Sequence, residues 1–399
     1  MRNLATIRQI DSISNINNYD KICVYTLKNL GWSIIAGKNE FKKEELIVYI
    51  EPDTILPVRP EFEFLRKRCW NSIYEGFRIR IMKLGGIYSQ GIIFPLLILP
   101  KSKLNFKFKF PFLYIWPTIY EEGLDVTSLL EIIRYDEEEM WELKYKKSHP
   151  QKQYWGLRKI LFKFHLIRKC KRPRRKKKLN FPSFFPKTNE TRLQTIPEIL
   201  EHIKEKEIYI SEKIDGTSGS FCYKDGEFGV YTRNTKIDRN ANPDLIGDCH
   251  WFCVIKYDIL NKLSFYCKKN NRNLVLQGEI IGPRIQSNKY ERIEPELYLY
   301  QIYDINKQKF LDFPEFIDIC TELKITVVPI IFKGNERNLN LNSVNKWIKF
   351  SIGKSYIFPL QEREGIVVRT CIEETIPRIK TIKQRLSFKV VSPEFQMQN

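Results

Sequence analysis

A lysine near the middle of the chain has the surroundings of a nucleophile. Lys213 ends an alternating apolar stretch, residues 207–213, and Asp215 and Gly216 follow it. A lysine amine attacks phosphorus only when it is deprotonated, and its ordinary pKa of about 10.4 must therefore be offset by burial, nearby cations or a metal-bound phosphate. Asp215 projects to the same side of an extended chain. The tetrapeptide KIDG, residues 213–216, also fits a strand that ends in solvated charges. A reactive lysine therefore requires partner residues elsewhere in the chain.

Four later segments with the composition of strands each carry one group suited to a nucleotide. An acidic residue in an apolar strand is costly to bury unless it meets a hydroxyl, a cation or a metal-bound water. An aromatic ring can stack on a base, which is worth roughly 1–3 kcal/mol. The four groups are Glu279 in LQGEIIGP, Tyr303 in LYLYQIYDIN, Glu364 in REGIVVRT and Lys389 in LSFKVVS.

The motifs EKIDG, TRN, QGEIIG, YQIYD, EGIVV and SFK occur in this order over residues 211–392. In this order they resemble the signature of the covalent nucleotidyltransferases, which include ATP-dependent RNA and DNA ligases and mRNA capping enzymes. The resemblance implies that Lys213 forms a lysyl-AMP phosphoramidate and acts with Asp215 and Lys389 in catalysis. It implies nucleotide contacts by Glu212, Lys213, Arg233, Glu279, Tyr303, Glu364 and Lys389, and metal contacts by Glu364, Asp215 and Glu279.

Departures from the wider signature favour an RNA ligase. DNA ligases of this superfamily usually have an arginine at the position of Ser218, whereas RNA ligases use the arginine after the next hairpin, here Arg233. Ligases and capping enzymes with a trailing OB domain continue well past the last lysine motif, whereas here the extra domain is expected in front. Many related RNA ligases have a second lysine at the position of Val391. Its role falls to Lys380 or Lys383, or to Lys389 and a metal alone.

Composition restricts the partners and the compartment. The 399 residues carry a formal net charge of +20, which favours a nucleic acid over an anionic membrane. Nine cysteines without CxxC spacing predict reduced thiols, and only four histidines leave little material for a zinc cluster or a histidine-based triad. The longest apolar stretch, residues 91–99, is too short to span a bilayer. We therefore expect a cytoplasmic monomer, or a nuclear one if the basic run 168–178 acts as a localisation signal.

The pattern of short strands and amphipathic stretches predicts an α+β protein with two domains. Residues 1–143 resemble an OB-like β-barrel with a helical extension at 121–143, in which Arg78, Arg80 and Lys83 are candidates for nucleic-acid contact. Residues 144–179 form a basic linker. Residues 180–399 form a nucleotidyltransferase (adenylation) domain of antiparallel sheets with flanking helices, one of them over residues 251–270.

The resemblance implies a specific reaction. The chain is expected to be an ATP-dependent RNA ligase that joins 3′-OH and 5′-phosphate ends through lysyl-AMP and an adenylylated 5′ end, using ATP and Mg²⁺ or Mn²⁺. The expected substrates are nicks in duplex RNA, with RNA/DNA hybrid nicks as a further possibility, in RNA repair. The alternatives are a capping-type guanylyltransferase, a DNA ligase, or a basic OB-type nucleic-acid binder without catalysis.

Overall fold

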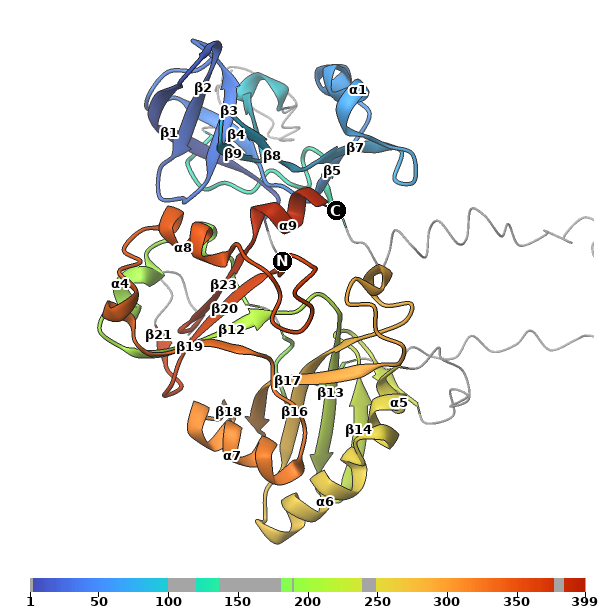
Figure 1. Ribbon diagram of the computed structural model, residues 1–399. Coiled ribbons are helices and arrows are strands. Elements are labelled where there is room, and N and C mark those ends of the chain that lie inside the picture. The colour runs from blue at the N-terminus through green and yellow to red at the C-terminus, as the bar shows by residue number, and fades with distance from the viewer. Residues whose placement is uncertain are drawn as a thin grey trace, which may run out of the picture.

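The computed structural model describes residues 3–99, 120–135, 181–188, 190–238, 249–376 and 384–398. Figure 1 shows an amino-terminal domain in blue beside a larger domain in green to red. Each domain has cores of its own, because no hydrophobic cluster of the described residues takes members from both. The predicted α+β class is confirmed, with helices flanking antiparallel sheets.

The amino-terminal domain is built on a long first strand that belongs to two pairings. The amino-terminal half of β1 pairs with β4, and its second half pairs with β2 after a bulge next to Ile10. Such a bend lets one strand turn the corner of a small, closed β structure. The elements are β1 (Ala5–Ile16), β2 (Tyr19–Leu27), β3 (Ser33–Gly37), β4 (Leu46–Ile50), β5 (Thr54–Leu56), α1 (Arg66–Cys69), β6 (Trp70–Asn71), β7 (Gly76–Ile79), β8 (Ile81–Leu84), β9 (Ile87–Gln90), β10 (Ile92–Pro95) and β11 (Ile133–Arg134).

The helical extension expected after this domain is wrong where the structure describes it. Residues 120–135 form turns that end in β11, which pairs with β5. The hydroxyl of Thr127 accepts hydrogen bonds from the backbone N–H groups of Leu4 and Ala5, at 2.9 and 3.0 Å. These long-range bonds to the start of β1 hold the segment against the barrel, so its helical spacing of apolar residues is overridden by tertiary packing.

The second domain contains two large antiparallel sheets and a two-stranded pairing of β21 with β22. The smaller sheet has the order β19-β12-β20-β23, and the larger has the order β15-β14-β13-β16-β17-β18. The strands are β12 (Glu207–Lys213), β13 (Thr217–Lys224), β14 (Glu227–Tyr231), β15 (Lys236–Ile237), β16 (Leu274–Ile281), β17 (Glu296–Asp304), β18 (Lys309–Phe310), β19 (Ile330–Asn335), β20 (Gly365–Thr370), β21 (Thr375–Ile376), β22 (Gln384–Arg385) and β23 (Ser387–Val391).

Helices cover the outer faces of these sheets (Figure 1). The helix expected at 251–270 is two helices, because Asp258 has φ +52° and its left-handed backbone breaks the hydrogen-bond ladder. None of the described helices is long and apolar enough to cross a bilayer. The helices are α4 (Ile199–Ile203), α5 (Cys249–Lys256), α6 (Ile259–Lys269), α7 (Phe313–Leu323), α8 (Val344–Ser351) and α9 (Pro393–Gln398).

The last helix, α9, joins the two domains through polar contacts. Glu394 accepts hydrogen bonds from Lys83 Nζ at 2.7 Å and from the hydroxyl of Tyr88 at 2.5 Å. Gln396 donates to Asp53 at 3.0 Å. Arg192, in the segment that leads into the second domain, donates to the same aspartate at 2.9 Å. The boundaries predicted at residues 143 and 179 lie outside the described residues.

Candidate active site

A cavity of about 650 Å³ lies where the two sheets of the second domain face the amino-terminal domain. The amino-terminal domain contributes Asp53, Arg78, Arg134 and Tyr135 to its wall. The second domain contributes most of the groups that the motifs predicted. Those that line the cavity are Glu212, Lys213, Asp215, Arg233, Glu279, Glu364 and Lys389.

Lys213 is the last residue of β12, and its amine points into this cavity. The strand lies inside its sheet, with β19 on one side and β20 on the other, so Lys213 does not stand on an edge strand. The side chain of Lys213 is 24% exposed. Its Nζ lies 2.5 Å from a carboxylate oxygen of Glu364, the residue just before β20. Burial disfavours the ammonium form, but the nearby carboxylates of Glu364 and Glu279 outweigh it and raise the pKa of Lys213. These carboxylates therefore favour the protonated amine.

Glu279, on β16, has a carboxyl group whose pKa lies well above its ordinary value. Its burial raises the pKa to about 8; Lys213 opposes this shift, and the negative charges of Glu364 and Asp215 add to it. Burial also raises the pKa of Glu364 itself, against the attraction of Lys213. The negative charges of Asp215, Glu279 and Glu364 thus act on the Lys213 amine in one cavity, which is typical of a site that receives a cation or exchanges protons.

Glu279→Gln should change how stability depends on pH. The folded carboxyl titrates at about 8 against an ordinary value of 4.5. Between these values the folded protein binds more protons than the unfolded chain, so the free energy of unfolding falls as pH rises. Glutamine does not titrate, so the variant does not lose free energy of unfolding in this way. We expect the melting temperature of the variant to exceed the wild-type value near pH 8 and to match it near about pH 5. Thermal unfolding followed by circular dichroism measures this; parallel pH curves for both proteins would refute it.

Asp215 is held by partners other than Lys213. Its carboxylate lies 2.6 Å from Nζ of Lys289, and its backbone N–H donates to the hydroxyl of Tyr290 at 2.9 Å. Both partners belong to the loop between β16 and β17. No signal in the sequence singled out this loop, because its residues form no motif.

Lys389 and Arg233 lie in the cavity wall from opposite sheets. Lys389 is in β23, and its backbone pairs with Val367 of β20, next to the strand that carries Lys213. Arg233 follows β14, as the hairpin pattern predicted. Val391, where a second lysine was sought, also lines the cavity. Lys380 and Lys383, the suggested substitutes, lie outside the described residues.

Glu212 does not offer its side chain to the cavity as a nucleotide contact. Side chains alternate along β12, so Glu212 projects to the face opposite Lys213. It is 1% exposed, and its carboxylate accepts a hydrogen bond from the backbone N–H of Tyr356 at 2.8 Å. The structure therefore gives this carboxylate a role in holding the loop before β20.

Tyr303 lies outside the cavity lining, and Tyr300 is the tyrosine of β17 that the lining includes. Tyr303 is 9% exposed and packs against Phe310, with ring centroids 5.1 Å apart, in a cluster closed by Phe185. The register shows the cause: Gln277 of β16 pairs with Gln301, but Gly278 pairs with Leu299, so Tyr300 is an extra, bulged residue. A bulge redirects a side chain in a way that an alternating pattern does not predict.

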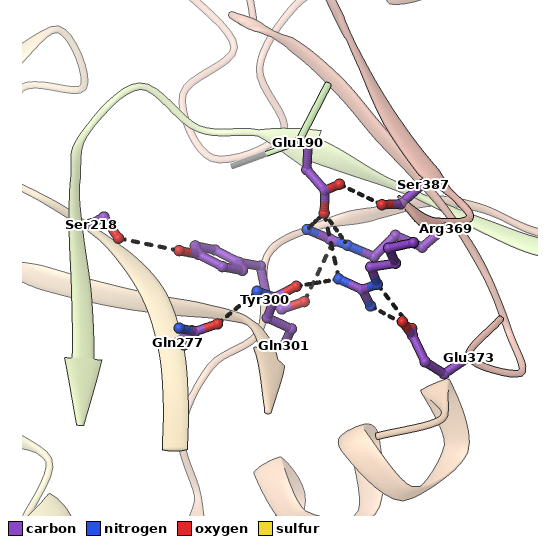
Figure 2. A network of polar contacts seen from close by, with 9 residues as sticks. Glu190, Ser218, Gln277, Tyr300, Gln301, Arg369, Glu373 and Ser387 are labelled. Atoms are coloured by element: carbon purple, nitrogen blue, oxygen red, sulfur yellow. Dashed lines mark hydrogen bonds and ion pairs between the residues drawn. The ribbon is translucent and has the colours of Figure 1, made fainter. Parts of the chain in front are cut away.

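A buried polar network connects this bulge to the smaller sheet (Figure 2). Glu190 accepts from Arg369 at 2.9 Å and from the hydroxyl of Ser387 at 2.5 Å. Burial works against its charge, but the guanidinium groups of Arg369 and Arg385 outweigh it and lower the pKa of Glu190. Arg385 also donates to Gln301 at 2.5 Å. Arg369 could have been recognised from the sequence, because it is a charged residue within the apolar strand GIVVRT. Glu190 and Arg385 have no such local pattern around them.

Alanine variants of Tyr300 and Tyr303 should have different effects. Tyr300→Ala should weaken nucleotide use by about 1–3 kcal/mol, because it removes the ring from the cavity wall. Tyr303→Ala should lower the free energy of unfolding by about 3 kcal/mol, because it empties a packed aromatic site. Nucleotide titration and thermal melting on both variants separate the two effects. A larger loss of nucleotide affinity in the Tyr303 variant would restore the first interpretation of the motif.

The donor set fits a hydrated cation. Within the described ranges, no group of three or more His, Cys, Asp and Glu side chains is placed to bind a metal directly. The carboxylates of Asp215, Glu279 and Glu364 nevertheless act on one amine, and the charge of Asp215 raises the pKa values of Glu279 and Glu364. A cation that keeps several waters, as Mg²⁺ usually does, can be held by such groups through its water shell.

Comparisons with known proteins agree with this arrangement. Residues 206–391 match the RNA ligase family and residues 4–96 match an OB-fold domain. Naegleria gruberi RNA ligase with PPi is 25% identical, with a TM-score of 0.72 and coverage of 100% of this chain and 99% of that one. Mutants of that ligase with ATP and Mn, and with AMP and Mn, are also 25% identical over 100% and 99% of the chains, with TM-scores of 0.73 and 0.71. No curated protein sequence matches the chain.

The fold and the lysine-centred cavity define a covalent nucleotidyltransferase. The amino-terminal β domain is an OB fold, and the sheets that hold Lys213 form a ligase domain. Residues 206–391 belong to the RNA ligase family, and the chain is an enzyme that shares its fold over its whole length with Naegleria RNA ligase.

Proposed function

We propose that this enzyme seals RNA by the three-step reaction that begins with ATP. The observation that carries the proposal is the Lys213 amine, 2.5 Å from Glu364, in a cavity that also presents Lys389, Arg233 and a tyrosine ring. The solved structures of the Naegleria ligase with ATP and Mn, and with AMP and Mn, support ATP and a divalent metal as its cofactors.

In the first step Lys213 attacks the α-phosphorus of ATP. Its proton passes to Glu364, whose raised pKa suits it to accept one. The N–P bond forms as the bond to the β-phosphate oxygen breaks, and pyrophosphate leaves. Lys389 and Arg233 offset the charge that develops on the phosphate. Asp215, Glu279 and Glu364 would hold a hydrated divalent cation, which would supply further positive charge beside the phosphate.

In the later steps the nucleotide is transferred and released. An oxygen of the polynucleotide 5′-phosphate attacks the phosphorus of lysyl-AMP, and the N–P bond breaks as Lys213 regains a proton. The 3′-OH of the other end then attacks the activated 5′-phosphate, and AMP leaves. Tyr300 offers its ring to the base throughout. The Glu190–Arg369 network holds β17 next to β20 of the other sheet.

We propose that the enzyme acts in RNA repair, on nicks in RNA duplexes and in RNA/DNA hybrids. The proposal is supported by the cavity, which both domains border. Arg78 is stacked over the ring of Tyr135 at 3.5 Å, and both line the side of the cavity that the OB domain forms. Arg80 is exposed on the same domain. Cations and a ring at this border can hold the strand next to the reacting end.

The proposed compartment is the cytosol, and the proposed state is a monomer. Several buried cysteines are free thiols, among them Cys222, Cys267 and Cys320, and burial raises their pKa values, so they are poor nucleophiles. The basic run 168–178, which would direct the enzyme to the nucleus, lies outside the described residues.

Labelling with ATP or GTP tests the proposed function. Protein incubated with α-labelled ATP and Mg²⁺ or Mn²⁺ should become labelled and release pyrophosphate, and mild acid should remove the label as expected for a P–N bond. Labelling by GTP in place of ATP would indicate a capping-type enzyme. No labelling by either would leave a nucleic-acid binder.

A further inference from the structure

The loop between β16 and β17 contains a lysine for which the motifs gave no function. Lys289 is 13% exposed and lines the cavity, and its ammonium lies 2.6 Å from Asp215. The ammonium also lies 4.7 Å from the centroid of the Phe395 ring in α9. It is therefore enclosed between a carboxylate and an aromatic face, and it is not a solvated surface charge.

The loop holds this lysine in a defined place. Five non-glycine residues between 284 and 291 have left-handed backbones, which occur only where surrounding contacts enforce them. Asn288 supplies two such contacts, since its side chain bonds the backbone of Arg292 in both directions at 2.9 and 3.0 Å. Tyr290 is almost fully buried under the catalytic turn. Lys289 directly follows Asn288, so the left-handed backbones and the hydrogen bonds of its neighbours fix its position in the cavity wall.

During the proposed reaction the cavity loses a positive charge and receives a further phosphate, so an additional cation such as Lys289 can bind there. The lysyl-AMP step converts Lys213 from a cation to a neutral phosphoramidate. A second phosphate, the 5′-phosphate of the polynucleotide, then enters the same cavity. On the strand that carries Lys389, the next cavity-facing residue is Val391, so that strand supplies no second ammonium. Lys289, from the loop between β16 and β17, supplies an ammonium to the same cavity.

Its position favours the polynucleotide over the nucleotide. Lys289 contacts Phe395, and the next residue of α9, Gln396, bonds Asp53 of the OB domain. The ammonium therefore stands near the border between the domains, whereas the Tyr300 ring lies beside Arg369 of β20, within the second domain. Given the proposed ligase function, we propose that Lys289 binds the 5′-phosphate of the polynucleotide in the sealing steps, and that Asp215 is its counter-ion until that phosphate arrives.

Binding to two nicked duplexes that differ only in the 5′ group tests this proposal. The full chain would be titrated with a nicked RNA duplex ending in 5′-phosphate and with one ending in 5′-OH, without ATP. The wild type should prefer the 5′-phosphate, and Lys289→Met should lose about tenfold of that preference, the usual effect of one charge-assisted contact. Lys289→Arg should retain most of it. Lys354→Met is the matched control, because Lys354 pairs with Glu362 at 2.7 Å but is 58% exposed and outside the cavity lining.

A second variant keeps the test decisive if the methionine protein folds poorly. Asp215→Asn removes the competing carboxylate, so the affinity for the 5′-phosphate nick should rise while the affinity for the 5′-OH nick stays unchanged. An unchanged 5′-phosphate preference in a folded Lys289→Met protein, or no tightening in Asp215→Asn, would overturn the proposal. Failure of the wild type to label with ATP would refute the proposed ligase reaction instead, and the two binding titrations do not depend on that result.

Discussion

Lys213→Ala should abolish labelling with ATP and leave part of the sealing of pre-adenylylated ends. The amine at the end of β12 is the nucleophile of the first step only, and the other lysines of the cavity lining are bonded elsewhere or lie on other strands. Alanine removes the amine and also frees Glu364 from its 2.5 Å partner. In the last step the 3′-OH attacks an activated 5′-phosphate, which does not require a lysine nucleophile. We therefore expect loss of label below detection.

The measurement uses one protein preparation for both reactions. Labelled ATP reports the first step, and an RNA nick with a chemically adenylylated 5′ end reports the last. Lys206→Ala is a suitable control, because Lys206 is ion-paired with Glu374 at 2.7 Å and does not line the cavity. A labelled Lys213→Ala protein would show that another residue carries the nucleotide, and the assignment of the whole cavity would then fail.

Removal of the first domain should separate labelling from sealing. The cores of the second domain contain no residue from the first, so a chain that begins at Asn180 retains its own packing. It also retains Lys213, Glu279, Glu364 and Lys389. It loses the cavity wall formed by the OB domain and the contacts of Asp53. Labelling should persist, whereas sealing of a nick should fall by roughly 100-fold or more, since the ends are no longer held in line.

A variant of the intact chain checks that this loss is due to substrate contacts. Arg78→Ala combined with Arg134→Ala removes two cations from the cavity wall on the OB side and leaves both domains in place. It should reduce nick sealing more than labelling and flatten the dependence of binding on salt. Circular dichroism of the shortened chain provides the folding control. If the shortened chain seals nicks as well as the full one, the OB domain does not hold the substrate.

The residues predicted most reliably were those on regular strands. Lys213, Glu279 and Lys389 each interrupt an apolar alternating run, and in a strand such a residue must face a cavity, solvent or a partner. The motifs around them therefore indicated both the sheet and the site. The β-barrel of the amino-terminal domain was predicted for a related reason, because its sequence has the pattern of short strands.

The remaining features depend on contacts between distant segments. Tyr303 was preferred to Tyr300 because alternation cannot reveal that one residue of β17 is bulged. Glu190 meets Arg369 across 179 positions of sequence, and no local pattern marks such a pair. Residues 120–135 have helical spacing but bond to β1 instead. Lys289 occupies a loop whose left-handed residues are not the glycines that would have indicated a turn.

The polar contact between the two domains has a consequence for how a duplex could enter. Among the described residues no apolar cluster crosses the boundary, and Lys83 and Arg192 reach across it to carboxylates. Partly exposed ion pairs of this kind contribute little net free energy in water. A nucleic-acid backbone is itself a row of anions, so it can replace Glu394 and Asp53 as the partner of these cations. Separation of the domains and capture of the strand would then be coupled through one exchange of counter-ions.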